Sequence, residues 1–217
     1  MNHISRTSKL DGIRSWSLQA GETCPGSIVN GEVVLPCAGC YAKVGNYHLP
    51  RVITARADNK QAWQEPYWVE QMVAALSIDR YFRWFDSGDC YHIEMARKIL
   101  RIMAATPWCD HWLPTRMYRF EKFRQVFELM DRLPNVKVRY SADSVTGQYE
   151  SHHGSTVYFD VNQLDEDVTV CSAPSTANKC SGCRQCWSKE VKVVAYKTHG
   201  NKMKGITNRL TKNLTSV

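Results

Sequence analysis

Short apolar segments alternate with amphipathic helical segments through the middle of this chain. Aromatic residues fill 80–85, which favours a strand, and apolar residues recur at helical spacing through 92–105, which favours a helix that ends before Pro107. The same alternation then repeats. The predicted strands and helices of this region are, in order, 80–85, 92–105, 111–115, 120–133 and 136–141. Such an order predicts right-handed crossovers and a mostly parallel sheet.

The flanking segments extend this pattern. A strand is predicted at 15–18 and a helix at 63–76, and later strands at 156–160, 168–171 and 191–196 have little helix between them. A chain of 217 residues is too short for a complete eight-unit barrel. The predicted fold class is therefore α/β, as a partial β/α barrel or an open sheet. Residues from 198 onward are basic with little apolar content, and they predict a solvated or disordered end.

Composition narrows the class of protein only slightly. Hydrophobic residues make up 43% and charged residues 23%, as in an ordinary globular protein. The chain has no apolar run of membrane-spanning length, and its start lacks the apolar core of a secretory signal, so we expect a cytoplasmic protein with no membrane partner. The net charge of +7 is compatible with a nucleic-acid or nucleotide partner, and equally with none.

The cysteines carry most of the candidate chemistry, because seven of the nine fall into two groups. Cys180, Cys183 and Cys186 are spaced by two residues each, with Cys171 upstream, which resembles a loop that wraps an iron–sulfur cube. Zinc is the alternative, although zinc sites more often use two separated pairs of ligands. The remaining two, Cys90 and Cys109, are expected to be buried small hydrophobes.

The front group contains Cys24, Cys37 and Cys40. Three thiolates leave one position of a metal centre open, whereas four close it. The alternative is a zinc site that His48 or Cys90 completes.

Polar residues at predicted strand ends are the other candidates, because working residues of α/β folds gather at the carboxyl ends of strands. Those ends carry Ser87-Gly88-Asp89, Thr115-Arg116 and Ser141. Ser and Asp beside Gly after a strand are also ordinary turn chemistry.

These motifs resemble a known superfamily. The loop ending Cys37-Ala-Gly-Cys40-Tyr-Ala, a strand ending in Ser87-Gly88-Asp89 and another ending in Thr115-Arg116 are similar to radical S-adenosylmethionine proteins in a divergent form. The chain also resembles the phage gene-product-88 family, which shares the motif at 82–89 and the C-terminal Cys-x-x-Cys-x-x-Cys-Trp followed by a strand and His-Gly. This resemblance spans about 15–200. The gap of twelve residues between Cys24 and Cys37 is longer than is usual in the superfamily.

The resemblance implies a specific arrangement of cofactors. Cys24, Cys37 and Cys40 would hold a 4Fe–4S cluster that binds S-adenosylmethionine at its open iron. The residues implied to contact that cofactor are Tyr41, Ser87, Gly88, Asp89, Thr115, Arg116 and Ser141. Cys171, Cys180, Cys183 and Cys186 would hold a second 4Fe–4S cluster.

Two functional hypotheses follow. The first is an iron–sulfur enzyme with a radical S-adenosylmethionine-like core that needs a reductant, located in the host-cell cytoplasm if phage-encoded. It would cleave S-adenosylmethionine reductively and modify a nucleotide, nucleic acid or peptide. The second is a non-catalytic protein, stabilised by iron–sulfur clusters or zinc, that binds nucleic acid or a host protein. Under either hypothesis we expect a core over 1–165, a cysteine-rich region packed on it over 166–200, and a basic tail over 201–217.

Overall fold

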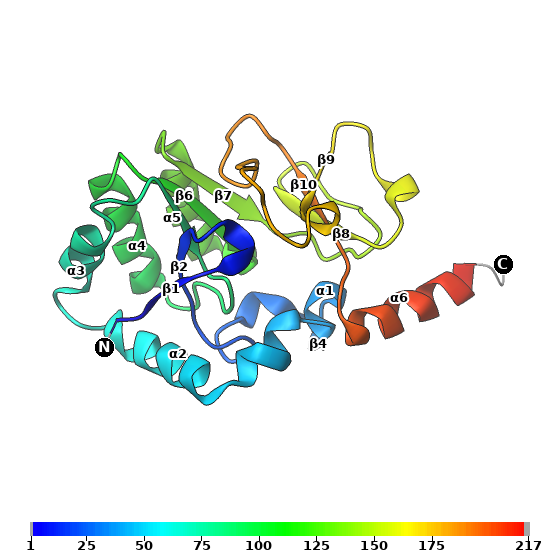
Figure 1. Cartoon of the computed structure of the whole chain (residues 1–217), viewed down its shortest axis with the longest axis horizontal. Coiled ribbons are helices and arrows are strands. Elements are labelled where there is room, and N and C mark those ends of the chain that lie inside the picture. Colours follow the sequence, from blue (N-terminus) through cyan, green and yellow to red (C-terminus); the bar gives the residue numbers. More distant parts are fainter. Residues whose placement is uncertain (1, 215–217) are drawn as a thin grey trace.

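A five-stranded sheet organises the larger part of the molecule (Figure 1). The computed structural model describes residues 2–214. The sheet has the order β1-β2-β5-β6-β7, in which β1 is antiparallel to β2 and the other pairings are parallel. Its strands are β1 (Ile4–Arg6), β2 (Arg14–Trp16), β5 (Tyr81–Trp84), β6 (Asp110–Thr115) and β7 (Val136–Tyr140). The chain therefore has a mixed α/β fold with a mostly parallel sheet.

Pro114 lies inside β6, although proline cannot donate a ladder hydrogen bond. The β5 register on β6 ends at Trp112, two residues before Pro114. Pro114 pairs with Arg139 of β7 alone. The strand tolerates the proline because its missing N–H falls beyond the end of the neighbouring strand.

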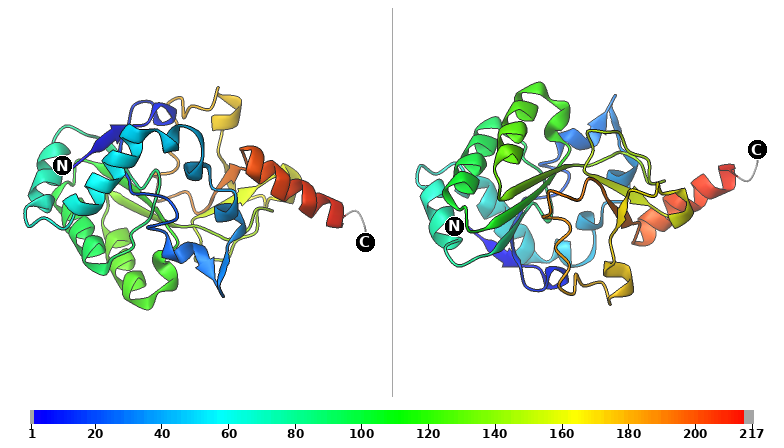
Figure 2. Two further views of the ribbon diagram at one scale, coloured as in Figure 1. Left: turned by 90° about the horizontal axis from the view of Figure 1, so that it is seen from below. Right: turned by 90° about the horizontal axis from the view of Figure 1, so that it is seen from above.

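Helices α3 (Trp68–Ala75), α4 (Ile93–Ala105) and α5 (Glu121–Arg132) pack side by side along one side of this sheet (Figures 1 and 2). The core between these layers is strongly aromatic, with Trp16, Phe82 and Trp84 fully buried. Each such side chain stabilises the fold by roughly 1.5–3 kcal/mol relative to an exposed one. Cys90 and Cys109 are buried in the same core, which confirms the prediction made for them.

A second, three-stranded sheet continues the first. It contains β8 (Ser155–Tyr158), β10 (Val194–Lys197) and β9 (Thr169–Val170), all parallel, in the order β8-β10-β9. A single parallel bridge between Ser141 and Ser155 joins β8 to the end of β7. The strands described here do not close into a barrel. The second sheet also draws a strand from each side of the expected boundary at residue 165.

Two predictions of local structure are corrected, and one helix was missed. The helix expected at 63–76 begins only at Trp68, because Pro66 keeps 63–67 in turns. A helix that was not predicted, α2 (Pro50–Ala62), precedes it. Residues 201–214 are solvated but not disordered, since they form α6 (Asn201–Leu214), whereas 215–217 lie outside the described residues.

Short elements complete the chain. They are the hairpin strands β3 (Ile28–Val29) and β4 (Glu32–Val33), the short helix α1 (Leu35–Ala38), and 3-10 helices at Ser8–Leu10, Pro25–Ser27, Tyr41–Lys43, Gly45–His48, Met117–Arg119, Val161–Gln163 and Ala173–Ser175. Within residues 2–214, none of the helices is long and apolar enough to span a membrane.

Candidate metal centres

The hairpin between Cys24 and Cys37 brings the two ends of the long gap together. Asn30 and Gly31 both have positive φ, 51° and 82°, as a tight two-residue hairpin turn requires. At the base of the hairpin the Val34 N–H donates to the Ser27 carbonyl at 2.9 Å. Residues 28–33 therefore form a hairpin whose two ends meet, so that the chain returns to the neighbourhood of Cys24 before it reaches Cys37.

The three front cysteines are partly buried, and the charges of Cys37 and Cys40 act on Cys24. Burial raises the pKa of Cys24 to about 12, with a contribution from the charges of Asp89, Cys37 and Cys40. Burial also raises the pKa of Cys37, while the Arg116 guanidinium opposes that rise. The Cys40 N–H donates to the Cys37 carbonyl at 3.2 Å, which folds the two-residue gap into a turn. A metal centre here would displace protons from buried thiols as it binds.

The Ser87-Gly88-Asp89 segment packs on the chain that leads into Cys24. The Leu18 N–H donates to the Ser87 carbonyl at 3.0 Å, and Ser87 Oγ donates to the Leu18 carbonyl at 2.7 Å. Gly88 has φ +76°, and a Cβ there would lie 2.6 Å from Thr23 Oγ1 and 2.7 Å from Leu18 Cβ. Only glycine fits this crossing, which places the end of β5 against the front cysteine loop.

Asp89 fastens the ends of two neighbouring strands. Its Oδ1 accepts from Thr115 Oγ1 and from the Cys90 N–H, both at 2.7 Å, and its Oδ2 accepts from the Arg116 N–H at 2.8 Å. Burial raises the pKa of Asp89 even though these hydrogen bonds oppose the rise. The Asp89 carboxylate lies near the front thiols, and its hydrogen bonds go to protein groups rather than to a ligand.

Arg116 brings a positive charge to the front site. Its Nη2 donates to the Ala142 carbonyl at 2.9 Å, and its Nε lies 3.4 Å from Asp143 Oδ1. Among the described residues, both Arg116 Nε and Asp143 Oδ1 are buried without a hydrogen bond. Ser141 stands on the adjacent strand end, where its Oγ accepts from Ser155 Oγ at 3.3 Å.

A network around Arg83 was not foreseen from the sequence. Arg83 Nη1 lies 2.7 Å from Asp86 Oδ1, and its guanidinium stacks over the Trp112 ring at 4.5 Å. Tyr41 hydroxyl donates to the Asp86 carbonyl at 2.8 Å and accepts a longer 3.4 Å bond from Arg83 Nη2. The charge of Arg83 also lowers the pKa of Cys186, so this side chain lies between the two cysteine groups. The sequence feature that could have indicated this network is Arg83, a single arginine among the aromatic residues 81–85.

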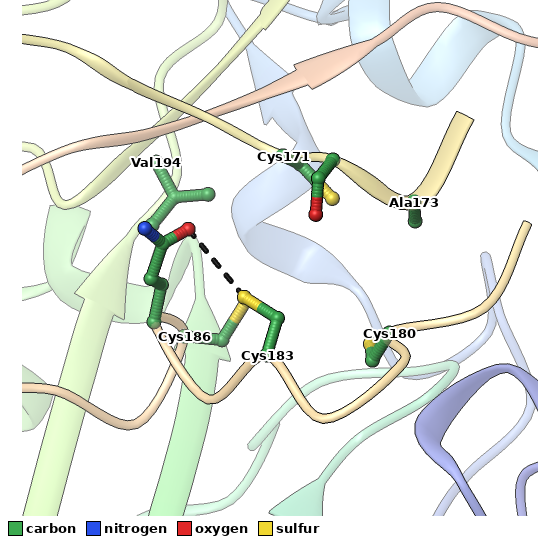
Figure 3. A pocket seen from close by; sticks show the side chains of 8 residues that line it. Cys171, Ala173, Cys180, Cys183, Cys186 and Val194 are labelled. Carbon is green, nitrogen blue, oxygen red and sulfur yellow. Dashed lines mark hydrogen bonds between the residues drawn. The ribbon is translucent and has the colours of Figure 1, made fainter. Parts of the chain in front are cut away.

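The four rear cysteines line one small hollow of about 20 Å³ (Figure 3). Cys171 follows β9, where its N–H donates to the Ala195 carbonyl at 2.9 Å. Cys180, Cys183 and Cys186 come from the loop before β10, and the Cys183 N–H donates to the Cys180 carbonyl at 2.9 Å. The four cysteines that the sequence analysis assigned to one group therefore all line this hollow.

Two side chains from distant segments shape the rear loop. Asp11 accepts from the Gly182 N–H at 2.9 Å and pairs with Arg184 at 3.0 Å. Arg139 is fully buried and donates to the Cys186 carbonyl at 2.8 Å. Burial raises the pKa of Cys186 to about 11, although a 3.1 Å bond to the Tyr196 hydroxyl and the charge of Arg139 oppose the rise.

A larger cavity, of about 180 Å³, adjoins the front group. One wall is Gly39, Cys40, Tyr41 and Val44, and the other is Gly200, Asn201 and Lys202 at the start of α6. The Tyr41 and His199 rings lie 5.4 Å apart nearby. Of the residues expected to contact a cofactor, Tyr41 is therefore the one that lines a cavity.

The alternative ligands for a front zinc site lie elsewhere. The Cys90 thiol is in the hydrophobic core, and His48 Nε2 lies 2.6 Å from the Lys43 carbonyl oxygen. Within residues 2–214, no group of three or more His, Cys, Asp or Glu side chains is arranged to hold a single metal ion.

Comparison with known proteins gives one match. The family model described as gene product 88 matches residues 3–212, nearly the whole chain. Neither the curated proteins nor the solved structures contain a match.

Proposed function

The chain belongs to the gene product 88 family of phage proteins, and for it we propose an iron–sulfur function. Cys24, Cys37 and Cys40 would hold a 4Fe–4S cluster with one open iron, and the four rear cysteines would hold a second, closed one. The front cluster would bind S-adenosylmethionine, and the protein would modify a substrate with the radical released from it.

The placement of the front cysteines carries the proposal. Three partly buried cysteines follow β2, and the charge of Asp89 at the carboxyl end of β5 acts on Cys24 and Cys37; ligands of α/β folds bind at this edge of a parallel sheet. Cys40 lines a cavity of about 180 Å³, so a small molecule can approach the group from that side. No fourth cysteine joins these three in the described chain.

The donor set and its surroundings suit an anionic cluster. Four thiols around one hollow are a donor set typical of a cubane cluster, and Arg139 and Arg83 supply positive charge beside them. At the front, the buried Arg116 Nε forms an ion pair with Asp143 Oδ1 at 3.4 Å but has no hydrogen bond in residues 2–214, so an anionic group that binds there would compete with Asp143. When bound, a reduced cluster supplies one electron at low potential.

The residues implied to bind S-adenosylmethionine fall into two groups, those whose side chain lines the cavity or has an unbonded donor and those whose side chains are engaged by hydrogen bonds within the protein. Tyr41 lines the cavity, and Arg116 has a buried donor to offer. Ser87, Asp89 and Thr115 are engaged by protein partners. We therefore propose that Arg116 contacts the cofactor, that Tyr41 lines the cavity through which a substrate approaches, that Asp89 and Thr115 position the strand ends, and that Gly88 allows their close approach.

Anaerobic purification followed by iron, sulfide and zinc analysis tests the proposal. We expect about eight iron atoms per chain, and about four after Cys24, Cys37 and Cys40 are all replaced by Ala or after Cys180, Cys183 and Cys186 are. Cys109→Ala is the matched control, because this buried thiol belongs to neither group. Stoichiometric zinc without iron in the anaerobic protein would contradict the proposal.

S-adenosylmethionine chemistry needs a separate assay. After chemical reduction, the protein should release 5′-deoxyadenosine, and the front triple variant should not. A protein with full iron content that neither binds nor cleaves S-adenosylmethionine would leave the clusters in place and refute the enzyme function.

A further inference from the structure

Helix α6 presents a basic surface that the front site does not account for. It carries Lys202, Lys204, Arg209 and Lys212 and no acidic residue between 201 and 214. All four cations are exposed. The helix extends outward from the body of the molecule (Figures 1 and 2).

The opposite face of α6 is fixed to the front cysteine loop. Met203 and Thr207, one turn apart, are only 4% and 8% exposed. Gly39 of the cysteine loop touches Met203 so closely that a Cβ there would lie 2.6 Å from Met203 Cε. Because helical residues advance by about 100° each, Lys202 and Arg209 point away from this packed face, and Lys204 lies at its flank. The cations therefore project outward from an anchored helix.

Charge complementarity indicates a polyanion, and the helix composition favours nucleic acid over a membrane. A helix that lies in a membrane surface needs a broad free apolar face, usually with aromatic residues. The centre of the apolar face of α6 is covered by the protein at Met203, and the helix contains no aromatic residue. Phosphates spaced along a strand, in contrast, need only outward-pointing Lys and Arg.

The basic helix leads directly to the cavity beside Cys40. Gly200, Asn201 and Lys202 at its start form one wall of that cavity, and Tyr41 forms part of the other. The Tyr41 side chain is 37% exposed and its ring lies 5.4 Å from that of His199. Aromatic rings of this kind serve as stacking platforms for unpaired bases.

We propose that the basic face of α6 binds the phosphate backbone of a single-stranded nucleic acid and that a base of the bound strand stacks on Tyr41 in this cavity. The backbone contact stands on α6 alone. The assignment of that strand as the substrate rests on the proposed function of the front site.

Fluorescence anisotropy with a labelled single-stranded oligonucleotide, measured at 50–200 mM salt, tests the docking. Replacing Lys202, Lys204 and Arg209 together by Gln removes three phosphate contacts, so the slope of log K against log salt should fall by about 2. Gln keeps helix propensity. The matched control replaces Arg101, Lys122 and Arg132, three exposed cations on α4 and α5, and should bind like the wild type.

The base contact has its own readout. Tyr41→Leu should weaken binding about tenfold and leave the salt slope unchanged, because stacking does not release counterions. An equal loss of oligonucleotide affinity in the α6 variant and the control variant would overturn the proposed docking. Binding to anionic phospholipid vesicles but not to the oligonucleotide would overturn it as well. Binding by a protein without iron would refute the proposed function alone, and full iron content without oligonucleotide binding would refute the docking alone.

Discussion

Arg139 holds the rear cysteine loop through backbone carbonyls only. The guanidinium is fully buried, and no carboxylate pairs with it among residues 2–214. Its nitrogens donate to the carbonyls of Gly154, Gln185, Cys186, Ser188, Val191 and Lys192, at 2.8–3.2 Å. Four of these carbonyls belong to the stretch 185–191, which contains Cys186. We therefore expect Arg139→Met to release this stretch.

The magnitude follows from the bonds that are lost. A hydrogen bond to a charged group contributes about 1.5–3 kcal/mol, but the freed carbonyls recover part of this from water as the loop opens. Each buried carbonyl that is left without a partner costs about 1–3 kcal/mol. Against a total stability of about 5–15 kcal/mol, we expect a loss of about 4 kcal/mol.

Urea unfolding of metal-free protein, followed by tryptophan fluorescence, measures this loss. With a slope of about 2 kcal/mol per molar urea, the midpoint should fall by about 2 M. Arg139→Lys keeps the charge and three donors, so its urea midpoint should lie between those of the wild type and Arg139→Met. Arg132→Met, on the exposed side of α5, should have the midpoint of the wild type. An unchanged midpoint, or a rear site in Arg139→Met that keeps its full iron, would refute the reasoning.

The other predictions concern three positions. Gly88→Ala should destabilise the protein by about 2–4 kcal/mol, because a Cβ would meet Leu18 and Thr23 at a positive φ, and iron analysis should show loss at the front site alone. Burial lowers the pKa of His111 to about 3, so the unfolded state binds its proton first as the pH falls below 6.5. The unfolding free energy should thus fall by about 1 kcal/mol per pH unit between pH 6 and 4, and less steeply in His111→Gln; equal slopes would contradict this. Met203→Asp should detach α6 from the cysteine loop, which limited proteolysis would detect as faster cleavage within 201–214, whereas Lys212→Asp should not.

The elements that could be predicted are those whose burial follows a local apolar pattern. Helices α4 and α5 begin and end within one residue or so of the predicted limits, because apolar side chains at helical spacing face the sheet. Helix α2 was missed because its buried residues include Arg56 and Asn59, which leave no apolar stripe to read. Pro50 at its first position was the remaining signal.

The packing of helix α6 and the burial of Arg83 and Arg139 depend on contacts with residues distant in the sequence. Met203 is buried only because Gly39 lies against it. Arg83 and Arg139 each occupy a strand position that alternation alone would assign to solvent, and their burial depends on Asp86 and on the loop 185–192. The neighbourhood of Cys180, Cys183 and Cys186, in contrast, follows from spacing, because two-residue gaps within a loop restrict the distance between side chains.

The long gap after Cys24 shows where spacing ceases to measure distance. Twelve residues separate Cys24 from Cys37, yet six of them, 28–33, leave and return through the hairpin closed by Asn30 and Gly31. Once that hairpin is set aside, six residues remain between the two cysteines. The Asn-Gly pair was visible in the sequence and is a strong hairpin signal. The length of the gap therefore does not argue against a site shared by Cys24, Cys37 and Cys40, and a deletion of 28–33 that joins Ser27 to Val34 should retain front-site iron if that site exists.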